Sequence, residues 1–233
     1  MIKAILFDLD GTLLPMDQEV FIRAYFGALV KKMSSFGYDA SLVDAIWKGT
    51  AAMVKNDGKM TNEERWWETF CGIYGAAARE DDARLEDFYA NEFEKVRASC
   101  GHNEGARRVI DLCHERGFRT ILATNPIFPA IATKARVRWA GLDFSDFELV
   151  TTYENSSYCK PNPDYYREIL KKQGLEPEDC VMVGNDVRED MIAKSLGMQV
   201  FLLTDCVINK DGRDLDEFPH GSFDELISFI SNL

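Results

Sequence analysis

Residues 4–12 read Ala-Ile-Leu-Phe-Asp-Leu-Asp-Gly-Thr, an apolar run that ends in two carboxylates separated by one residue. Residues 4–7 show no polar alternation, which predicts a strand buried on both faces of a parallel sheet. Because side chains alternate along a strand, Asp8 and Asp10 should point to the same side, roughly 7 Å apart. Buried carboxylates are costly without a nearby cation. Alone, these residues would also fit an ordinary Asp-Gly turn, so the rest of the chain decides between a site and a turn.

The length and charge of the chain narrow its class. Its 233 residues suffice for one large domain or for a core with a smaller partner. The net charge of −12 argues against nucleic acid or an anionic membrane surface as partners. A phosphate substrate stays possible, because a bound cation can invert the local potential. We find no apolar stretch of roughly 18 residues and no signal peptide, which predicts a cytoplasmic protein; monomer and homodimer are both open.

Hydrophobic periodicity divides the chain into two kinds of segment. Residues 16–99 contain no buried-type strand and predict helices at 18–33, 41–54, 61–74 and 84–98. After residue 100, helices alternate with strands. The predicted helices are 104–116, 128–139, 163–173, 190–196 and 223–230, and the predicted strands are 120–123, 147–151, 180–183 and 199–203. This alternation predicts an α/β fold with a doubly wound parallel sheet. The core would comprise residues 1–15 and 100–233, and an inserted all-helical cap residues 16–99.

Several polar residues should meet at one edge of this sheet. Ligands of open α/β sheets bind outside the carboxyl ends of the strands. The residues predicted there are Asp8, Asp10, Thr124, Asn125, Lys160, Asp186 and Asp190. Carboxylates and carbonyl oxygens without His or Cys suit a hard, octahedral cation, most simply Mg²⁺. Together with Lys160, Mg²⁺ would neutralise a phosphate that the carboxylates would otherwise repel.

This set of residues predicts phosphoryl chemistry. An ionised Asp can act as nucleophile and form an aspartyl-phosphate. A second carboxyl two residues later can protonate the leaving oxygen and then deprotonate water. Backbone N–H groups from Leu9 to Gly11 and the Thr124 hydroxyl would hold the phosphate oxygens, and Asn125 is a further candidate for contact. Individually, Thr124 also fits a turn, Lys160 a solvated loop lysine, and Asp190 a helix N-terminus.

Four segments of the chain resemble, in order, the motifs of the haloacid dehalogenase superfamily. They are FDLDGT at 7–12, LATN at 122–125, CKPNP at 159–163 and VGNDVRED at 183–190. The resemblance implies a Rossmann-like core, with Asp8 as nucleophile and Asp10 as acid/base. It also implies phosphate contact by Thr124 and a clamping role for Lys160. The implied Mg²⁺ ligands are Asp8, Asp10 through its carbonyl, Asp186, and Asp190 directly or through water.

The helical segment between the first two motifs resembles the four-helix cap of this superfamily. Members that displace halide typically carry another residue in place of Asp10, so its presence favours phosphoryl transfer. The chain is therefore predicted to be a Mg²⁺-dependent phosphatase acting on a small phosphorylated metabolite. A phosphosugar mutase is the alternative, and a non-catalytic binding module is less favoured because no core carboxylate is missing. The charged cap residues are predicted to be solvated rather than substrate anchors: Arg23, Lys48, Lys55 and Arg65.

Overall fold

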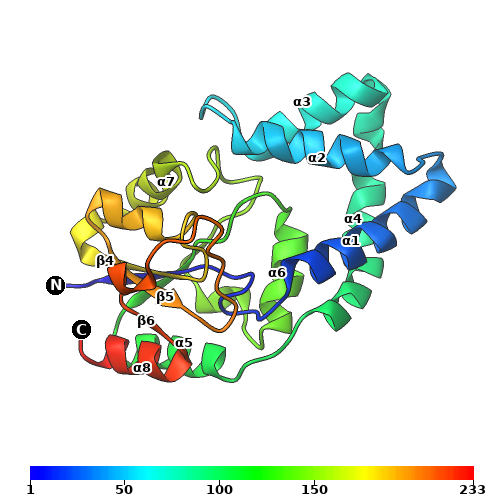
Figure 1. The fold of residues 1–233 in the computed structure, drawn as a ribbon. Coiled ribbons are helices and arrows are strands. Elements are labelled where there is room, and N and C mark those ends of the chain that lie inside the picture. Colours follow the sequence, from blue (N-terminus) through cyan, green and yellow to red (C-terminus); the bar gives the residue numbers. More distant parts are fainter.

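The computed structural model describes all 233 residues and contains one six-stranded parallel sheet (Figure 1). The strand order is β3-β2-β1-β4-β5-β6. The central strand β1 (Ala4–Phe7) pairs with β2 (Arg119–Leu122) and β4 (Cys180–Gly184). The outer strands are β3 (Leu149–Val150), β5 (Gln199–Leu203) and β6 (His220–Gly221). This sheet confirms the predicted fold class, and every residue of β1 is buried.

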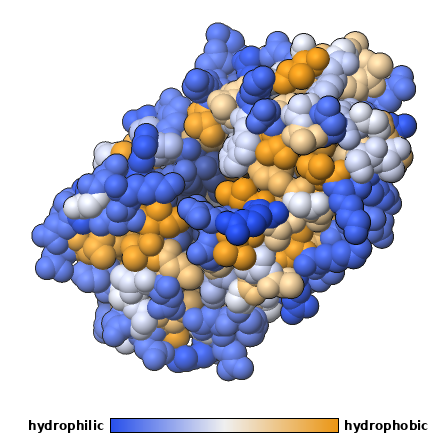
Figure 2. Space-filling view, turned by 45° about the vertical axis from the view of Figure 1, so that its right-hand side comes forward, coloured by the Kyte–Doolittle hydropathy of each residue, from blue (hydrophilic) through white to orange (hydrophobic).

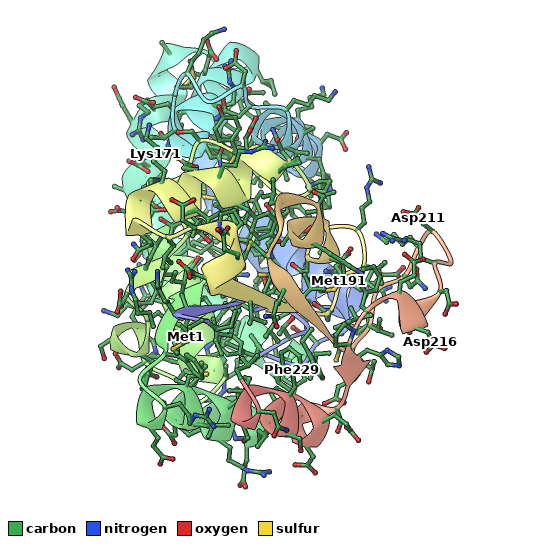
Figure 3. The ribbon with its side chains drawn as sticks, turned by 90° about the vertical axis from the view of Figure 1, so that its left-hand side faces the viewer. Met1, Lys171, Met191, Asp211, Asp216 and Phe229 are labelled. Atoms are coloured by element: carbon green, nitrogen blue, oxygen red, sulfur yellow. The ribbon has the colours of Figure 1, made fainter.

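Helices cover both faces of the sheet because its strands are apolar on both sides. Ile5 and Phe7 face one hydrophobic core, whereas Ala4 and Leu6 face the other. The first core is covered by α5 (Gly105–Glu115), α6 (Ala130–Trp139) and α8 (Phe223–Ser231). The second is covered by α7 (Pro163–Gln173) and the 3₁₀ turns at Met191–Leu196. Figure 3 shows α7 and α8 on opposite sides of the strands. The ring centres of Phe229 in α8 and Phe201 in β5 are 5.2 Å apart.

All six strands lie outside residues 16–99, and those residues are mainly helical. Their helices are α1 (Gln18–Met33), α2 (Ser41–Val54), α3 (Asn62–Tyr74) and α4 (Asp82–Ala90). The predicted capping box is present, since the Thr61 hydroxyl accepts from the Glu64 N–H while Glu64 accepts from the Thr61 N–H. The boundaries at residues 15/16 and 99/100 as limits of two domains stay a prediction. No helix in the chain is both long enough and apolar enough to cross a bilayer.

The predicted helix at 84–98 is wrong in its second half. The helix α4 ends at Ala90, and residues Glu92–Ser99 form 3₁₀ turns. Between them, Asn91 leaves helical geometry, and its side-chain amide donates to the backbone carbonyl of Asp87 at 3.1 Å and to the Asp87 carboxylate at 2.7 Å. Asn side chains compete with the backbone for such hydrogen bonds, which interrupts a helix although the apolar spacing continues.

Smaller differences arise where elements are short. The predicted helix at 190–196 is a 3₁₀ segment, which ends at Gly197 in a left-handed conformation. In so short a segment the spacing of apolar residues does not distinguish a 3₁₀ helix from an α-helix. The predicted strand at 147–151 contains only two paired residues, and β6 is not predicted. The helix predicted from residue 128 begins at Ala130, because Pro129 is extended and serves as its N-cap.

The beginning of α3 is fastened to loops of the sheet. The buried Asn62 donates its backbone N–H to the Ser156 carbonyl at 2.8 Å. Its side-chain amide donates to the carbonyls of Pro126 at 3.2 Å and Tyr158 at 3.3 Å. The Glu63 N–H adds a bond of 2.8 Å to a carbonyl of the loop after β3. One end of α3 is therefore fixed to the loops that follow β2 and β3.

Packing of α2 on α3 depends on the small size of Gly49. A Cβ at this position would lie 2.5 Å from the ring of Trp66. We expect Gly49→Ala to lower the free energy of unfolding by about 1–3 kcal/mol, as overpacking does. The matched control is Gly27→Ala in α1, where a Cβ meets nothing within 4 Å; it should instead stabilise by about 0.5–1 kcal/mol. Urea unfolding measures both, and equal effects would contradict this account.

Candidate active site

Lys160 joins two aspartates below the carboxyl end of the sheet. Its Nζ donates to Asp8 Oδ1 at 2.8 Å and to Asp190 Oδ1 at 2.6 Å. Lys160 is 1% exposed, which excludes a solvated loop lysine. Burial disfavours its charge, but Asp190 and Asp8 attract it more strongly, so the pKa of Lys160 lies well above its ordinary value. The ammonium is therefore a fixed positive charge beside the predicted nucleophile.

The Asp8 carboxylate is oriented from its other side by residues of its own turn. The Thr12 hydroxyl lies 3.1 Å from Asp8 Oδ2 and 3.0 Å from Asn185 Oδ1, and it can donate its hydrogen to either. The turn requires Gly11, which has a φ of 87° and where a Cβ would lie 2.3 Å from Asn185 Nδ2. The FDLDGT and VGNDVRED segments thus meet through packing as well as through charge.

The two aspartates after β4 have different surroundings. Asp190 uses both oxygens within the protein, because Oδ2 accepts from the Asp186 N–H at 2.9 Å while Oδ1 binds Lys160. Burial raises the pKa of Asp190, and Lys160 opposes that shift. Asp186 accepts two backbone N–H bonds at Oδ1, which leaves its Oδ2 without a protein donor. Asp186 is therefore the freer of the two to bind a ligand.

The donor atoms fit Mg²⁺ in the way this ion usually binds. Asp8, Asp10, Asp186 and Asp190 all line one cavity, and all offer hard oxygen donors. No three His, Cys, Asp or Glu side chains gather closely enough to hold a metal by themselves. Because Mg²⁺ usually keeps several waters and takes only one or two carboxylates plus phosphate oxygens, Asp8, Asp186 and the Asp10 carbonyl suffice. Asp190 would act on such a site through Asp186 and Lys160.

The predicted phosphate-binding groups fall into two sets. The Thr124 hydroxyl lines the cavity and makes no hydrogen bond within the protein, and the N–H groups of Leu9 and Asp10 have no protein acceptor. Gly11 differs, because its N–H donates to the Leu14 carbonyl at 2.8 Å. The turn itself therefore uses the Gly11 N–H in this structure, and its contact with phosphate stays a prediction.

Asn125 is likewise occupied within the protein. Its Oδ1 accepts from the Lys160 N–H at 3.2 Å, and its Nδ2 donates to Glu189 Oε2 at 3.1 Å. Its amide therefore holds the Lys160 loop, although the residue lines the cavity. Glu189, which the sequence analysis missed, lines the same cavity, and burial raises its pKa to about 7. Its place inside the VGNDVRED segment was the available signal.

Arg136 is the main residue that the sequence analysis missed. It is fully buried in α6 and forms an ion pair with Asp10 Oδ2. Its Nη2 donates to the Thr133 hydroxyl at 3.3 Å, and its guanidinium lies 4.4 Å from the centre of the Phe128 ring. Burial raises the pKa of Asp10, Arg136 opposes that shift, and Asp8 reinforces it. The position of this arginine between Ala135 and Val137 in α6 was the only sequence signal.

Comparison with known families identifies this arrangement. The family model described as haloacid dehalogenase-like hydrolase matches residues 2–197 of the chain. The chain belongs to this family. Membership makes the haloacid dehalogenase-like chain an enzyme of the hydrolase class, and it confirms the resemblance carried by the four motifs.

Individual relatives of this haloacid dehalogenase-like hydrolase are distant. The pyrophosphatase PpaX of Bacillus velezensis is 24% identical over 84% of this chain and 80% of its own length. The crystal structure of a 2-haloacid dehalogenase from Pseudomonas syringae superposes with a TM-score of 0.67 at 17% identity, covering 100% of this chain and 99% of that one. That of the hydrolase YfnB from Bacillus subtilis, bound to magnesium, gives 0.55 at 19% identity, with 98% of each chain covered. These structures share the fold.

The buried charges give a test of the site that does not depend on catalysis. Lys160→Met would leave the carboxylates of Asp8 and Asp190 facing each other without a cation. We expect the free energy of unfolding to fall by about 3–5 kcal/mol, as when one partner of a buried ion pair is removed. The control is Lys171→Met, at an exposed position of α7 (Figure 3). Denaturant unfolding that gives the two variants the same stability would contradict the assigned ion pairs.

Proposed function

We propose that this enzyme is a Mg²⁺-dependent phosphatase that hydrolyses a phosphomonoester through an aspartyl-phosphate on Asp8. The observation that carries this proposal is the buried Lys160, whose ammonium binds the Asp8 carboxylate and orients it at the floor of a cavity. A carboxylate fixed in this way is a nucleophile that needs no further deprotonation. The pyrophosphatase relative and the magnesium-bound structure of a related hydrolase support the same chemistry.

Substrate phosphate would be held by groups that the protein leaves unpaired. The N–H groups of Leu9 and Asp10 and the Thr124 hydroxyl are free to donate to its oxygens. Asp8 would attack phosphorus while the bond to the leaving oxygen breaks, and Asp10 would give that oxygen a proton. Asp10 would then take a proton from the water that attacks the aspartyl-phosphate, which regenerates Asp8 and releases phosphate. Lys160 stays charged throughout and offsets the negative charge of the site.

Bound Mg²⁺ would supply positive charge that Lys160 alone does not provide against a phosphate dianion. Asp8, Asp186 and the Asp10 carbonyl would hold it, because they offer hard oxygen donors beside the position of the phosphate. The role of Asp190 would be indirect, since both of its oxygens are already engaged.

Dehalogenation is the main competing reaction in this fold, and Asp10 argues against it. A departing halide needs no proton, so an acid/base beside the nucleophile would have no task. In this chain Asp10 is held by an arginine that is fully buried. Because burying a guanidinium is costly, the pair is better explained by a reaction that uses the Asp10 carboxyl.

Phosphate release from simple phosphomonoesters tests the proposed function. With Mg²⁺, the parent protein should release phosphate, and Asp8→Asn should lower turnover to background because an amide does not form the phosphoenzyme. Excess chelator should have the same effect, reversed by added Mg²⁺. Turnover by Asp8→Asn near the parent rate would rule out the covalent mechanism, and full activity in chelator would rule out the metal.

The role of Asp10 is tested together with Arg136. We expect Asp10→Asn to lower kcat by about 10²–10⁴-fold, the usual contribution of a general acid/base. Arg136→Met should also lower kcat more than it raises KM, because the carboxyl loses its position, and Arg136→Lys should recover part of the loss. Arg138→Met, at an exposed position of the same helix, is the control. Parent kcat in folded Arg136→Met would show that the arginine has no part in positioning Asp10.

A further inference from the structure

The cavity above Asp8 is large and predominantly apolar. Its volume is about 650 Å³, within the range of small-molecule sites. Of its 32 lining residues 17 are hydrophobic, and α1, α2, α3 and α4 all contribute. Figure 2 shows hydrophobic surface beside a hollow in the molecule. The apolar lining reaches the solvent at Trp47 and Val54, which are 45% and 40% exposed. A ligand that covers these two side chains would remove apolar surface from water.

No lysine, arginine or histidine lines this cavity. The charged cap residues considered in the sequence analysis lie outside the lining: Arg23, Lys48, Lys55 and Arg65. The nearby Arg79 is also outside it, and its guanidinium pairs with Asp82 at 2.6 Å and with Glu63 at 3.4 Å. An anionic group on the part of the substrate that faces the cap would therefore meet no free cation.

The polar groups at the cap end of the cavity are mainly carboxylates. Glu154 accepts from the Ala130 N–H at 2.8 Å through Oε1, whereas its Oε2 is buried without any donor. Glu63 and Asp82 line the same cavity and share a single guanidinium, that of Arg79. Such groups repel a second phosphate or carboxylate. At the other end, Lys160 is already shared by Asp8 and Asp190, so it offers no charge to a distant group.

We infer that the substrate is a phosphomonoester whose alcohol part is apolar and carries no second phosphate or carboxylate. This inference rests on the proposed phosphatase function and adds the substrate class. The transferred phosphate would occupy the sheet edge, while an aliphatic or aromatic alcohol would fill the space among Phe21, Tyr25, Trp47 and Phe128. The absence of lysine, arginine and histidine from the lining also argues against a phosphosugar mutase, because the doubly phosphorylated sugar of such a reaction needs a cationic group at the far end of the cavity.

The first test compares three substrates with six carbons each that differ at the end remote from the phosphate: hexyl phosphate, 6-aminohexyl phosphate and 6-phosphooxyhexanoate. Burial of the methyl terminus and repulsion of the carboxylate should together favour hexyl phosphate over 6-phosphooxyhexanoate by about 10- to 100-fold in kcat/KM. The amine, which the lining carboxylates attract rather than repel, should be turned over with a higher kcat/KM than 6-phosphooxyhexanoate. Equal or faster Asp8-dependent turnover of 6-phosphooxyhexanoate would overturn the inference and leave the phosphatase function standing.

A variant identifies the source of the discrimination. Glu154→Gln keeps an acceptor for the Ala130 N–H but removes the charge, so it should raise kcat/KM for 6-phosphooxyhexanoate and narrow the ratio severalfold. Glu176→Gln, at an exposed position remote from the cavity lining, should leave the ratio unchanged. An unchanged ratio in Glu154→Gln would show that the lining carboxylates do not select against anions.

Binding without turnover separates the inference from the proposed function. Trp47 and Trp66 line the cavity and report on it by fluorescence. With Mg²⁺, hexylphosphonate should change this fluorescence at a lower concentration than 6-phosphonohexanoate does. That preference without phosphate release from any ester would refute the phosphatase function and retain the apolar ligand class. No binding of either phosphonate together with no turnover would refute both.

Discussion

The buried ammonium of Lys160 is the interaction on which the site depends. Asp8 follows β1 and Asp190 lies after β4, and without a cation between them their carboxylates would repel each other inside the protein. The loop that carries Lys160 is held in turn by Asn125, which follows β2. The polar residues that follow three adjacent strands, β2, β1 and β4, thus depend on one another for their hydrogen bonds and ion pairs. These contacts form only when the three strands are in register. The same contacts that offset the cost of burying the charges also orient the nucleophile.

The sheet and the catalytic edge were largely predictable because their signals are local. The apolar runs of β1 and β4 indicate strands buried on both faces, and the polar residues that end them must meet at one edge. The ends of α1 and α2 follow from apolar spacing, and the start of α3 follows from its capping box. Lys160 was placed by its motif alone, since nothing in its neighbours indicates that the side chain is buried.

The remainder was not predictable because it depends on contacts between distant segments. The ion pair of Arg136 with Asp10 joins residues 126 positions apart, and periodicity in α6 does not reveal a buried charge. The N–H of Gly11 donates to the Leu14 carbonyl within a turn, and the residue types in this segment do not reveal that bond. At Asn91 a side-chain hydrogen bond overrides apolar spacing, and β6 is too short to carry a pattern. Which cap side chains face the cavity likewise depends on how four helices pack.

The attachment of Asn62 has a consequence for how the cavity exchanges its contents. Asn62 begins α3 and bonds to the backbone beside Cys159, the residue before Lys160. Lifting α3 from the sheet would therefore break several buried hydrogen bonds and pull on the loop that carries the catalytic cation. The side chains of Trp47 and Val54, at the rim of the cavity, are partly exposed to solvent already. We therefore expect substrate and product to enter and leave past the exposed side chains of α2, while α3 stays fixed to the loops of the sheet.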